Sequence, residues 1–329
     1  MPTSLTVHLG NRSYPIVIGR GLLGGGFDLA QFVRGADCLV VSNETVAPLY
    51  YDKLLLNLPG RDVSSVILPD GEAHKTVATM QTILDALVAS RANRDVCLIA
   101  LGGGVVGDIA GFAAACYMRG IDFIQVPTTL LAQVDSSVGG KTGVNHAQGK
   151  NLIGAFHQPQ MVLIDTDTLG TLPDRELSAG LAEVIKHGVI CDPEFFAWLE
   201  SNIAALVRRD PDALEHAIRR CCKIKAEVVA EDEREAGRRA ILNFGHTFGL
   251  AIEYSQGYGE WLHGEAVAAG MIMAAKLSGL DDADVQRVVD LVKAAGLPVA
   301  PPAIAVPDWK RAMGMDKKVK GKQLRFVLL

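Results

Sequence analysis

Long apolar segments are missing from this sequence. No stretch of about 18 residues is free of both charged residues and glycine clusters, so we expect no membrane-spanning helix. The first residues, MPTSLTVH, lack a basic region followed by an apolar core, so we expect no secretory signal peptide. Both absences predict a protein of the cytoplasm.

The sequence also lacks cysteines spaced as metal ligands and lacks an excess of basic residues. The six cysteines show no metal-ligand spacing, and most lie in apolar runs, so we expect buried thiols in a reducing compartment. They are Cys38, Cys97, Cys116, Cys191, Cys221 and Cys222. The net charge is −5, and the short lysine cluster at 317–322 is expected to be a solvated surface. We therefore expect neither a nucleic acid nor a membrane as a partner.

What the sequence does contain is an ordinary globular composition over 329 residues, a length that suggests two domains. Strands are predicted at 37–42, 64–69, 96–103, 122–128 and 161–166, with helices at 76–91 and 108–118. This alternation predicts an α/β domain with a parallel sheet over residues 1–173. Residues 174–329 have mostly helical periodicity, which predicts a helical second domain and a ligand cleft between the two.

A glycine-rich segment follows one of these strands. Residues 98–112 read LIALGGGVVGDIAGF and place Gly102, Gly104 and Gly107 between a strand and a helix. Glycines let a pyrophosphate approach the backbone, and the helix N-terminus offers N–H groups to it. The segment departs from the dinucleotide fingerprint, because two strands precede it and Asp122 begins the next strand instead of ending it. A tight turn with close helix packing remains the alternative.

A second polar segment, LPDGEAHKT at 68–76, follows another strand. Asp70 and Glu72 suit ribose hydroxyls, and Lys75 suits a phosphate. Taken alone, a plain Asp-Gly turn explains this segment better.

Three residues of the second half suit a metal ion. Glu183 lies in an otherwise apolar helix with Lys186 one turn away, His246 lies among glycines, and His263 lies at a loop-to-helix junction. One carboxylate and two imidazoles suit zinc with open coordination positions. A structural role stays open for each histidine, whereas an isolated buried carboxylate is costly and needs a partner.

Cations are spread along the chain in places unlike a solvated charge run. They are Arg119, Lys141, Lys150, Lys186, Lys225, Arg239 and Lys317, and several flank glycines, Asn151 or Asn243. Together they predict a strongly anionic small substrate. For Lys225 and Lys317, an exposed helical lysine is an equally good explanation.

Eight segments together carry a specific pattern: PDGEAHK, LGGGVVGDIAGF, QVPTTLLAQVDSSVGGKTGVN, GKNLIGAFHQP, ELSAGLAEVIKHG, LNFGHTFG, WLHGEAVAAGM and DKKV. With them the chain resembles the 3-dehydroquinate synthase family over nearly its whole length. The resemblance implies a Rossmann-like α/β domain followed by a helical metal-binding domain. It also implies NAD, a divalent metal (zinc or cobalt) and a homodimer.

The reaction implied by the resemblance belongs to the shikimate pathway and has no net oxidation. In 3-deoxy-D-arabino-heptulosonate 7-phosphate, a ring hydroxyl is oxidised with NAD, and the ketone acidifies the neighbouring C–H. Phosphate is eliminated, the hydride is returned, and the ring opens and closes by an aldol step to 3-dehydroquinate.

The resemblance also assigns residues by motif. The metal ligands are Glu183, His246 and His263. The NAD contacts are Asp70, Gly71, Glu72, Ala73, His74, Lys75, Gly104, Val105, Val106, Gly107, Asp108, Thr128, Thr129, Lys141, Lys150, Thr168, Leu169, Gly170 and Thr171. The catalytic and substrate-binding positions are Asp135, Lys141, Asn151, Lys186, Lys225, Arg239, Asn243, Arg119 and Lys317 or Lys318. Of these, Lys225 and Arg239 suit the carboxylate, and Asn243, Arg119 and Lys317 suit the phosphate. The position of Arg119 reaches the partner subunit's site in this family.

Two departures accompany the resemblance. The family continues GHTFG with histidine, whereas this chain has Leu250, which predicts lowered turnover. Family members also continue for a few dozen residues beyond the position of Leu329, and the connection AAKLSGLDD is a few residues short. We therefore expect the natural chain to be heavier than 35.1 kDa, which intact mass measures.

Three alternative functions stay open at this point. The first is a related cyclase acting on another sugar phosphate, although Arg239 and Asn243 favour a carboxylate substrate. The second is an oxidoreductase similar to glycerol dehydrogenase, which shares the glycine motif and a metal site. The third is a paralogue that binds NAD and metal without turnover.

Overall fold

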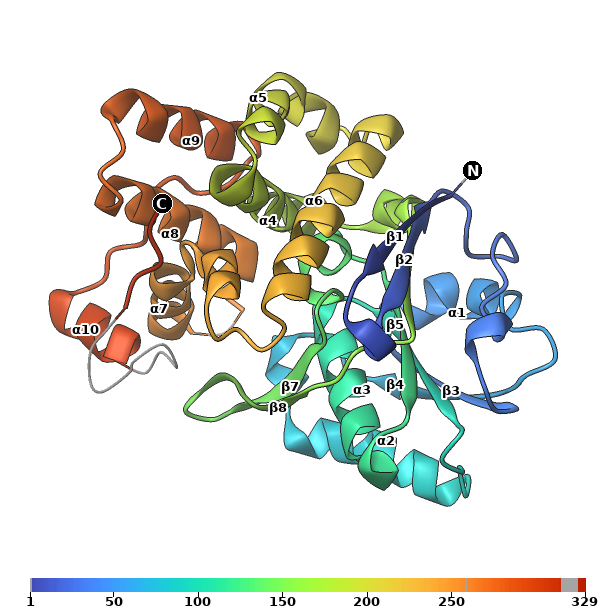
Figure 1. Ribbon diagram of the computed structural model, residues 1–329. Coiled ribbons are helices and arrows are strands. Elements are labelled where there is room, and N and C mark those ends of the chain that lie inside the picture. The colour runs from blue at the N-terminus through green and yellow to red at the C-terminus, as the bar shows by residue number, and fades with distance from the viewer. Residues whose placement is uncertain (1, 258, 315–324) are drawn as a thin grey trace. The chain divides into compact units, whose positions relative to one another are not determined.

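The computed structural model describes residues 2–257, 259–314 and 325–329 (Figure 1). Residue contacts divide the chain into two compact units. The first comprises Met1–Thr171 with Lys225–Ala230, and the second comprises Leu172–Ile224 with Glu231–Leu329. The boundary expected from the sequence lies after residue 173, whereas the contacts place it after Thr171 and also return 225–230 to the first unit.

The first unit is built on a seven-stranded sheet with the order β1-β2-β9-β6-β5-β3-β4. The strands are β1 (Thr3–Val7), β2 (Tyr14–Gly19), β3 (Asp37–Asn43), β4 (Asp62–Leu68), β5 (Cys97–Gly102), β6 (Asp122–Pro127) and β9 (Met161–Asp165). β1 is antiparallel to β2, and every other neighbouring pair is parallel. The predicted parallel sheet is confirmed. β1 and β2 were not predicted, because β1 is half polar and β2 contains Pro15.

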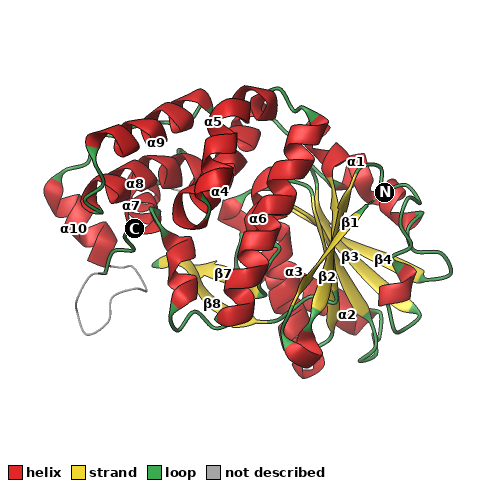
Figure 2. Ribbon diagram, turned by 45° about the horizontal axis from the view of Figure 1, so that its top comes forward, coloured by secondary structure: helices red, strands yellow, loops and turns green. Residues whose placement is uncertain are grey.

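Helices cover both faces of this sheet (Figure 2). They are α1 (Ala47–Leu55), α2 (Val77–Ala89) and α3 (Gly104–Cys116). Along β5, Leu98 and Ala100 pack with α2 and α3, whereas Ile99 and Leu101 pack with α1. Successive side chains of a strand point to opposite faces, so a strand buried on both sides is apolar throughout. This explains the continuous apolar run in the sequence of β5.

The carboxyl ends of the parallel strands carry the segments predicted to bind NAD. The chain leaves β3 toward β4 on one side and leaves β5 toward β6 on the other, so the strand order reverses between β3 and β5. Ligands of open α/β sheets bind outside the carboxyl ends of the strands at such a point. The glycine segment directly follows β5 and therefore lies at this position.

Helix α3 begins at Gly104, four residues earlier than the predicted helix at 108–118. Gly102 ends β5, whereas Gly104 and Gly107 are themselves helical, which their low helix propensity concealed. The helix ends at Cys116, because Met118 has a φ of 46°. An antiparallel hairpin of β7 (Lys141–His146) and β8 (Gly149–Phe156), also missed from sequence, completes the unit.

The second unit is helical, with no strand among the residues that the structure describes. Its helices are α4 (Asp174–Cys191), α5 (Pro193–Val207), α6 (Pro211–Glu231), α7 (His246–Gln256), α8 (His263–Leu277), α9 (Asp282–Ala294) and α10 (Val306–Gly314). Residues 225–230 of α6 belong to the first unit. Asp192 separates α4 from α5 by accepting a hydrogen bond from the Phe195 N–H as the N-cap. In the described ranges, no helix is long and apolar enough to cross a membrane.

Candidate active site

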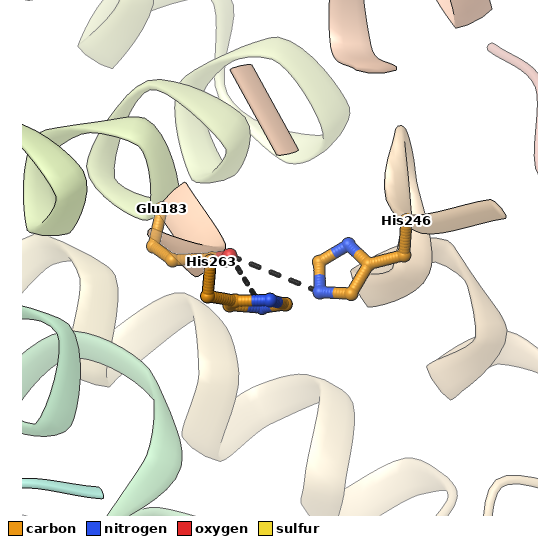
Figure 3. Close-up of side chains that lie close together, drawn as sticks. All are labelled: Glu183, His246 and His263. Carbon is orange, nitrogen blue, oxygen red and sulfur yellow. Dashed lines mark ion pairs between the residues drawn. The ribbon is translucent and has the colours of Figure 1, made fainter. Parts of the chain in front are cut away.

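Three side chains predicted to bind metal meet in the second unit. They are Glu183 on α4, His246 at the start of α7 and His263 at the start of α8, and their ligand atoms lie within 4.8 Å of one another. Glu183 Oε1 lies 3.8 Å from Nε2 of each histidine, and Figure 3 shows the three side chains converging. These separations are too long for hydrogen bonds but suit ligands arranged around one ion.

Two glycines allow these helices to approach closely. A Cβ on Gly264 would lie 1.9 Å from the carbonyl oxygen of Ala179, so α8 begins directly against the backbone of α4. Gly245, the N-cap of α7, has a φ of +78°, and a Cβ there would lie 2.7 Å from the backbone nitrogen of Met271. Each glycine neighbours one of the two predicted metal-binding histidines in sequence, so the positions of both imidazoles depend on this close packing.

The carboxylate of Glu183 is fully buried, and its side chain forms an ion pair with Lys186, whose side chain is 1% exposed. Among the described residues, no hydrogen bond reaches Glu183 Oε1. A buried carboxylate oxygen without a hydrogen bond is costly unless another positive group compensates it. One carboxylate and two imidazoles are a donor set for zinc or cobalt with open positions, so these residues fit a divalent metal.

In the first unit, the glycine segment lies against the segments that follow β6. Thr128 donates its N–H to the carbonyl of Gly102 at 3.0 Å, and a Cβ on Gly103 would lie 3.1 Å from Thr129. A Cβ on Gly107 would meet the Gln125 side chain at 2.6 Å. The packing role that we kept open is therefore present at Gly107. The N-terminus of α3 has no side-chain cap, so its first N–H groups suit a phosphate.

Lys75 joins the segment after β4 to α3. Its side chain is nearly buried, and Nζ lies 2.5 Å from Asp108 Oδ2 and 2.7 Å from Asn151 Oδ1. Burial raises the pKa of Asp108, and the neighbouring Lys75 opposes this shift. The structure thus brings together three predicted site residues that are 33 to 76 positions apart in sequence.

The acidic residues of this segment are held by Asn43, Thr45 and Asn145, which were not predicted as site residues, and by the predicted Lys150. Asp70 accepts hydrogen bonds from Asn43 at 2.6 Å and from Thr45 at 2.7 Å. Glu72 accepts one from Asn145 at 2.7 Å and lies 3.8 Å from Lys150 Nζ. The position of Asn43 at the carboxyl end of a predicted strand was the signal available in the sequence.

Two other predicted groups lie in the first unit. Lys225, which belongs to the first unit with residues 226–230, donates to the Asp135 carbonyl at 2.7 Å and forms an ion pair with the Asp135 carboxylate. Thr168 and Thr171 line a cavity of about 290 Å³ together with Tyr50. Of the predicted NAD-binding segment at 168–171, these two threonines border the cavity. Lys141 begins β7.

Arg239 and Asn243, two of the predicted anion-binding residues of the second unit, lie in the 3-10 helix Arg238–Asn243. Arg239 is 1% exposed and donates to the carbonyl of Glu233, and Asn243 donates to Glu235. The carboxylate of Asp232 accepts hydrogen bonds from the backbone N–H of Arg239 and from two other backbone N–H groups. These hydrogen bonds lower the pKa of Asp232, and the one from Arg239 contributes most. Neither Glu235 nor Asp232 was predicted as a site residue.

Arg119 and Lys317 or Lys318 are the other predicted phosphate-binding positions. Arg119 is exposed, with a φ of 68° in the turn that follows α3. Lys317 and Lys318 lie outside the described residues.

Comparison with known proteins identifies the family. A model described as 3-dehydroquinate synthase N-terminal matches residues 65–179, and one described as 3-dehydroquinate synthase C-terminal matches residues 180–319. The chain belongs to the 3-dehydroquinate synthase family. A 3-dehydroquinate synthase from Methylococcus capsulatus (strain ATCC 33009 / NCIMB 11132 / Bath) is 60% identical over 99% of this chain and 92% of its own length. One from Saccharophagus degradans (strain 2-40 / ATCC 43961 / DSM 17024) is 59% identical over 99% of this chain and 91% of its own.

Solved structures of other cyclases are similar at lower identity. A 2-deoxy-scyllo-inosose synthase complexed with carbaglucose-6-phosphate, NAD+ and Co2+ has a TM-score of 0.89 at 29% identity, covering 99% of this chain and 92% of that one. ValA, a 2-epi-5-epi-valiolone synthase from Streptomyces hygroscopicus subsp. jinggangensis 5008 with NAD+ and Zn2+ bound, has a TM-score of 0.86 at 32% identity, covering 93% and 87%. The higher identity to 3-dehydroquinate synthases favours that family's reaction over those of the other cyclases.

Proposed function

We propose that this chain converts 3-deoxy-D-arabino-heptulosonate 7-phosphate to 3-dehydroquinate and phosphate as an NAD- and metal-dependent enzyme of the shikimate pathway. The observation that carries the proposal is the meeting of Glu183, His246 and His263 in a chain of this family. These residues would hold a divalent metal. When bound, the metal supplies Lewis-acid polarisation of the substrate hydroxyl that is oxidised.

The first unit would bind NAD. The segments after β4, β5, β6 and β9 all follow carboxyl ends of parallel strands, which supports this assignment. Gly104–Asp108 would receive the pyrophosphate at the N-terminus of α3, and Asp70 and Glu72 would accept hydrogen bonds from ribose hydroxyls. The contacts among Lys75, Asp108 and Asn151 hold the two segments together before NAD binds.

The cationic and amide side chains would bind the substrate. Lys225 and Arg239 suit its carboxylate, and Asn243 with Lys317 or Lys318 suits its phosphate. Asp135, Lys141, Asn151 and Lys186 would complete the site. The proton removed in the elimination has an acceptor in the substrate's own phosphate, so the chain needs only to hold that group beside the C–H.

Phosphate release separates this function from an oxidoreductase. With the heptulosonate phosphate and NAD, we expect inorganic phosphate to appear over many turnovers without a net change in NADH absorbance. Absorbance that grows with turnover would show a dehydrogenase. Absence of phosphate from this substrate, with release from another sugar phosphate, would show a different cyclase.

We further propose a homodimer in which Arg119 of one subunit binds the phosphate in the site of the other. Exposure of Arg119 in the single chain supports this role. We expect an Arg119→Ala chain mixed with a Glu183→Gln chain to recover part of the lost activity, because one site in each heterodimer then has both residues intact. Differently tagged chains allow isolation of the heterodimer, and their homodimers give the baseline. Activity of the isolated heterodimer no higher than that baseline would contradict the proposal.

A further inference from the structure

The second ring nitrogen of His263 is held by a buried carboxylate. Nδ1 of His263 lies 2.7 Å from Oε1 of Glu253, whose exposed fraction is 2%. On the same ring, Nε2 faces Glu183 Oε1 at 3.8 Å. The imidazole therefore lies between two carboxylates, one within hydrogen-bond distance and one across the gap proposed for the metal.

The two histidines of the site are oriented by different kinds of acceptor. Nδ1 of His246 lies 3.2 Å from the backbone carbonyl of Phe244. Nδ1 of His263 instead contacts a carboxylate, at a shorter distance. A carboxylate is the stronger acceptor, and it makes the imidazole more basic at the other nitrogen.

Glu253 is buried, so it is not an ordinary surface carboxylate exposed to solvent. It lies on α7, seven residues after His246, and is buried where α7 packs against α8. Neighbouring Ile252 belongs to an apolar cluster with Ala266 and Ala269 of α8. Burying a carboxylate is costly unless hydrogen bonds or charges compensate, and Oε1 of Glu253 contacts a residue of the site.

We propose that Glu253 is a positioning residue for the metal. By accepting the Nδ1–H of His263, it fixes the tautomer in which Nε2 carries the lone pair, and it fixes the ring plane toward Glu183 and His246. This inference rests on the metal site of the proposed function and adds a fourth residue that nothing in the family resemblance assigned.

Zinc affinity of the metal-free protein tests the proposal directly. We expect Glu253→Gln to lower it by about 10–100-fold in competition with a chromophoric chelator, since losing the partner of a metal-binding histidine has effects of that size. The amide keeps the length of the side chain and removes the charge. Glu200→Gln is the matched control, because Glu200 pairs with Arg287 in the same unit and does not touch the site. It should bind zinc as the unmodified chain does.

Two further readouts distinguish positioning from a loss of folding. The zinc titration is done at a temperature at which circular dichroism shows that both metal-free variants are folded. The NAD affinity of both variants should equal that of the unmodified chain. The visible spectrum of bound Co2+ should shift in Glu253→Gln, because it reports ligand geometry. Equal zinc affinity and an identical cobalt spectrum would overturn the role of Glu253. Failure of the unmodified chain to bind zinc or cobalt would instead overturn the metal site itself.

Discussion

Replacing Glu183 with glutamine is expected to remove bound metal and lower turnover by roughly 10²–10⁴-fold. The amide is a poor ligand, and two imidazoles alone are too few for tight binding of zinc. The turnover loss corresponds to several kcal/mol of Lewis-acid stabilisation at the hydroxyl being oxidised. Elemental mass spectrometry after dialysis measures the metal bound per chain, and a phosphate-release assay measures the turnover.

The ion pair with Lys186 makes folding the necessary control for this substitution. Both side chains are buried, so removing the carboxylate leaves an ammonium whose burial costs about 3–5 kcal/mol. Glu183→Asp keeps the charge but shortens the reach, and we expect it to fold while binding metal more weakly than the unmodified chain. NAD affinity should persist in both variants, because the predicted NAD-binding segments belong to the first unit. Stoichiometric metal in the folded glutamine variant would contradict the assignment of Glu183 as a ligand.

The sequence predicted the sheet well because its signals are local. Each strand buried on both faces is a continuous apolar run, and β5 is the clearest example. The same reasoning failed for β1, whose exposed alternate positions are polar, and for the β7–β8 hairpin, whose glycines and lysines look like a loop. The division of α6 between two units could not be predicted either, since it depends on contacts between segments far apart in sequence, such as that of Lys225 with Asp135 across 90 positions.

The candidate site was predictable where one residue is chemically out of place. A glutamate in an apolar helix requires a partner, and Lys186 and the two histidines lie where such partners are needed. The residues that support the site gave no comparable signal. Glu253 is ordinary in its local sequence, and only the packing of α7 on α8 reveals its partner. Asn43 follows a predicted strand, but only the structure shows that it donates to Asp70.

Replacing Leu250 with histidine is expected to raise kcat for phosphate release by at least about tenfold, which corresponds to roughly 1.4 kcal/mol of barrier. Leu250 lies one turn after His246 on α7, so both side chains share a face of the helix, and Leu250 is only partly buried. A histidine there would supply a proton donor or acceptor next to the proposed metal and phosphate, and a positioned acid or base contributes roughly 10²–10⁴-fold in favourable cases.

Leucine leaves the elimination to the substrate's own phosphate, which predicts a slow but folded enzyme that binds NAD, metal and substrate normally. Leu250→Gln is the matched comparison for the histidine variant, because it adds polarity at the same position without a group that titrates near neutral pH. We expect it to leave kcat close to that of the unmodified chain, so a gain confined to histidine assigns the effect to proton transfer. Equal kcat for the unmodified chain and Leu250→His, with unchanged zinc content, would show that the side chain at position 250 only packs against its apolar neighbours. This departure from the family pattern would then not lower turnover.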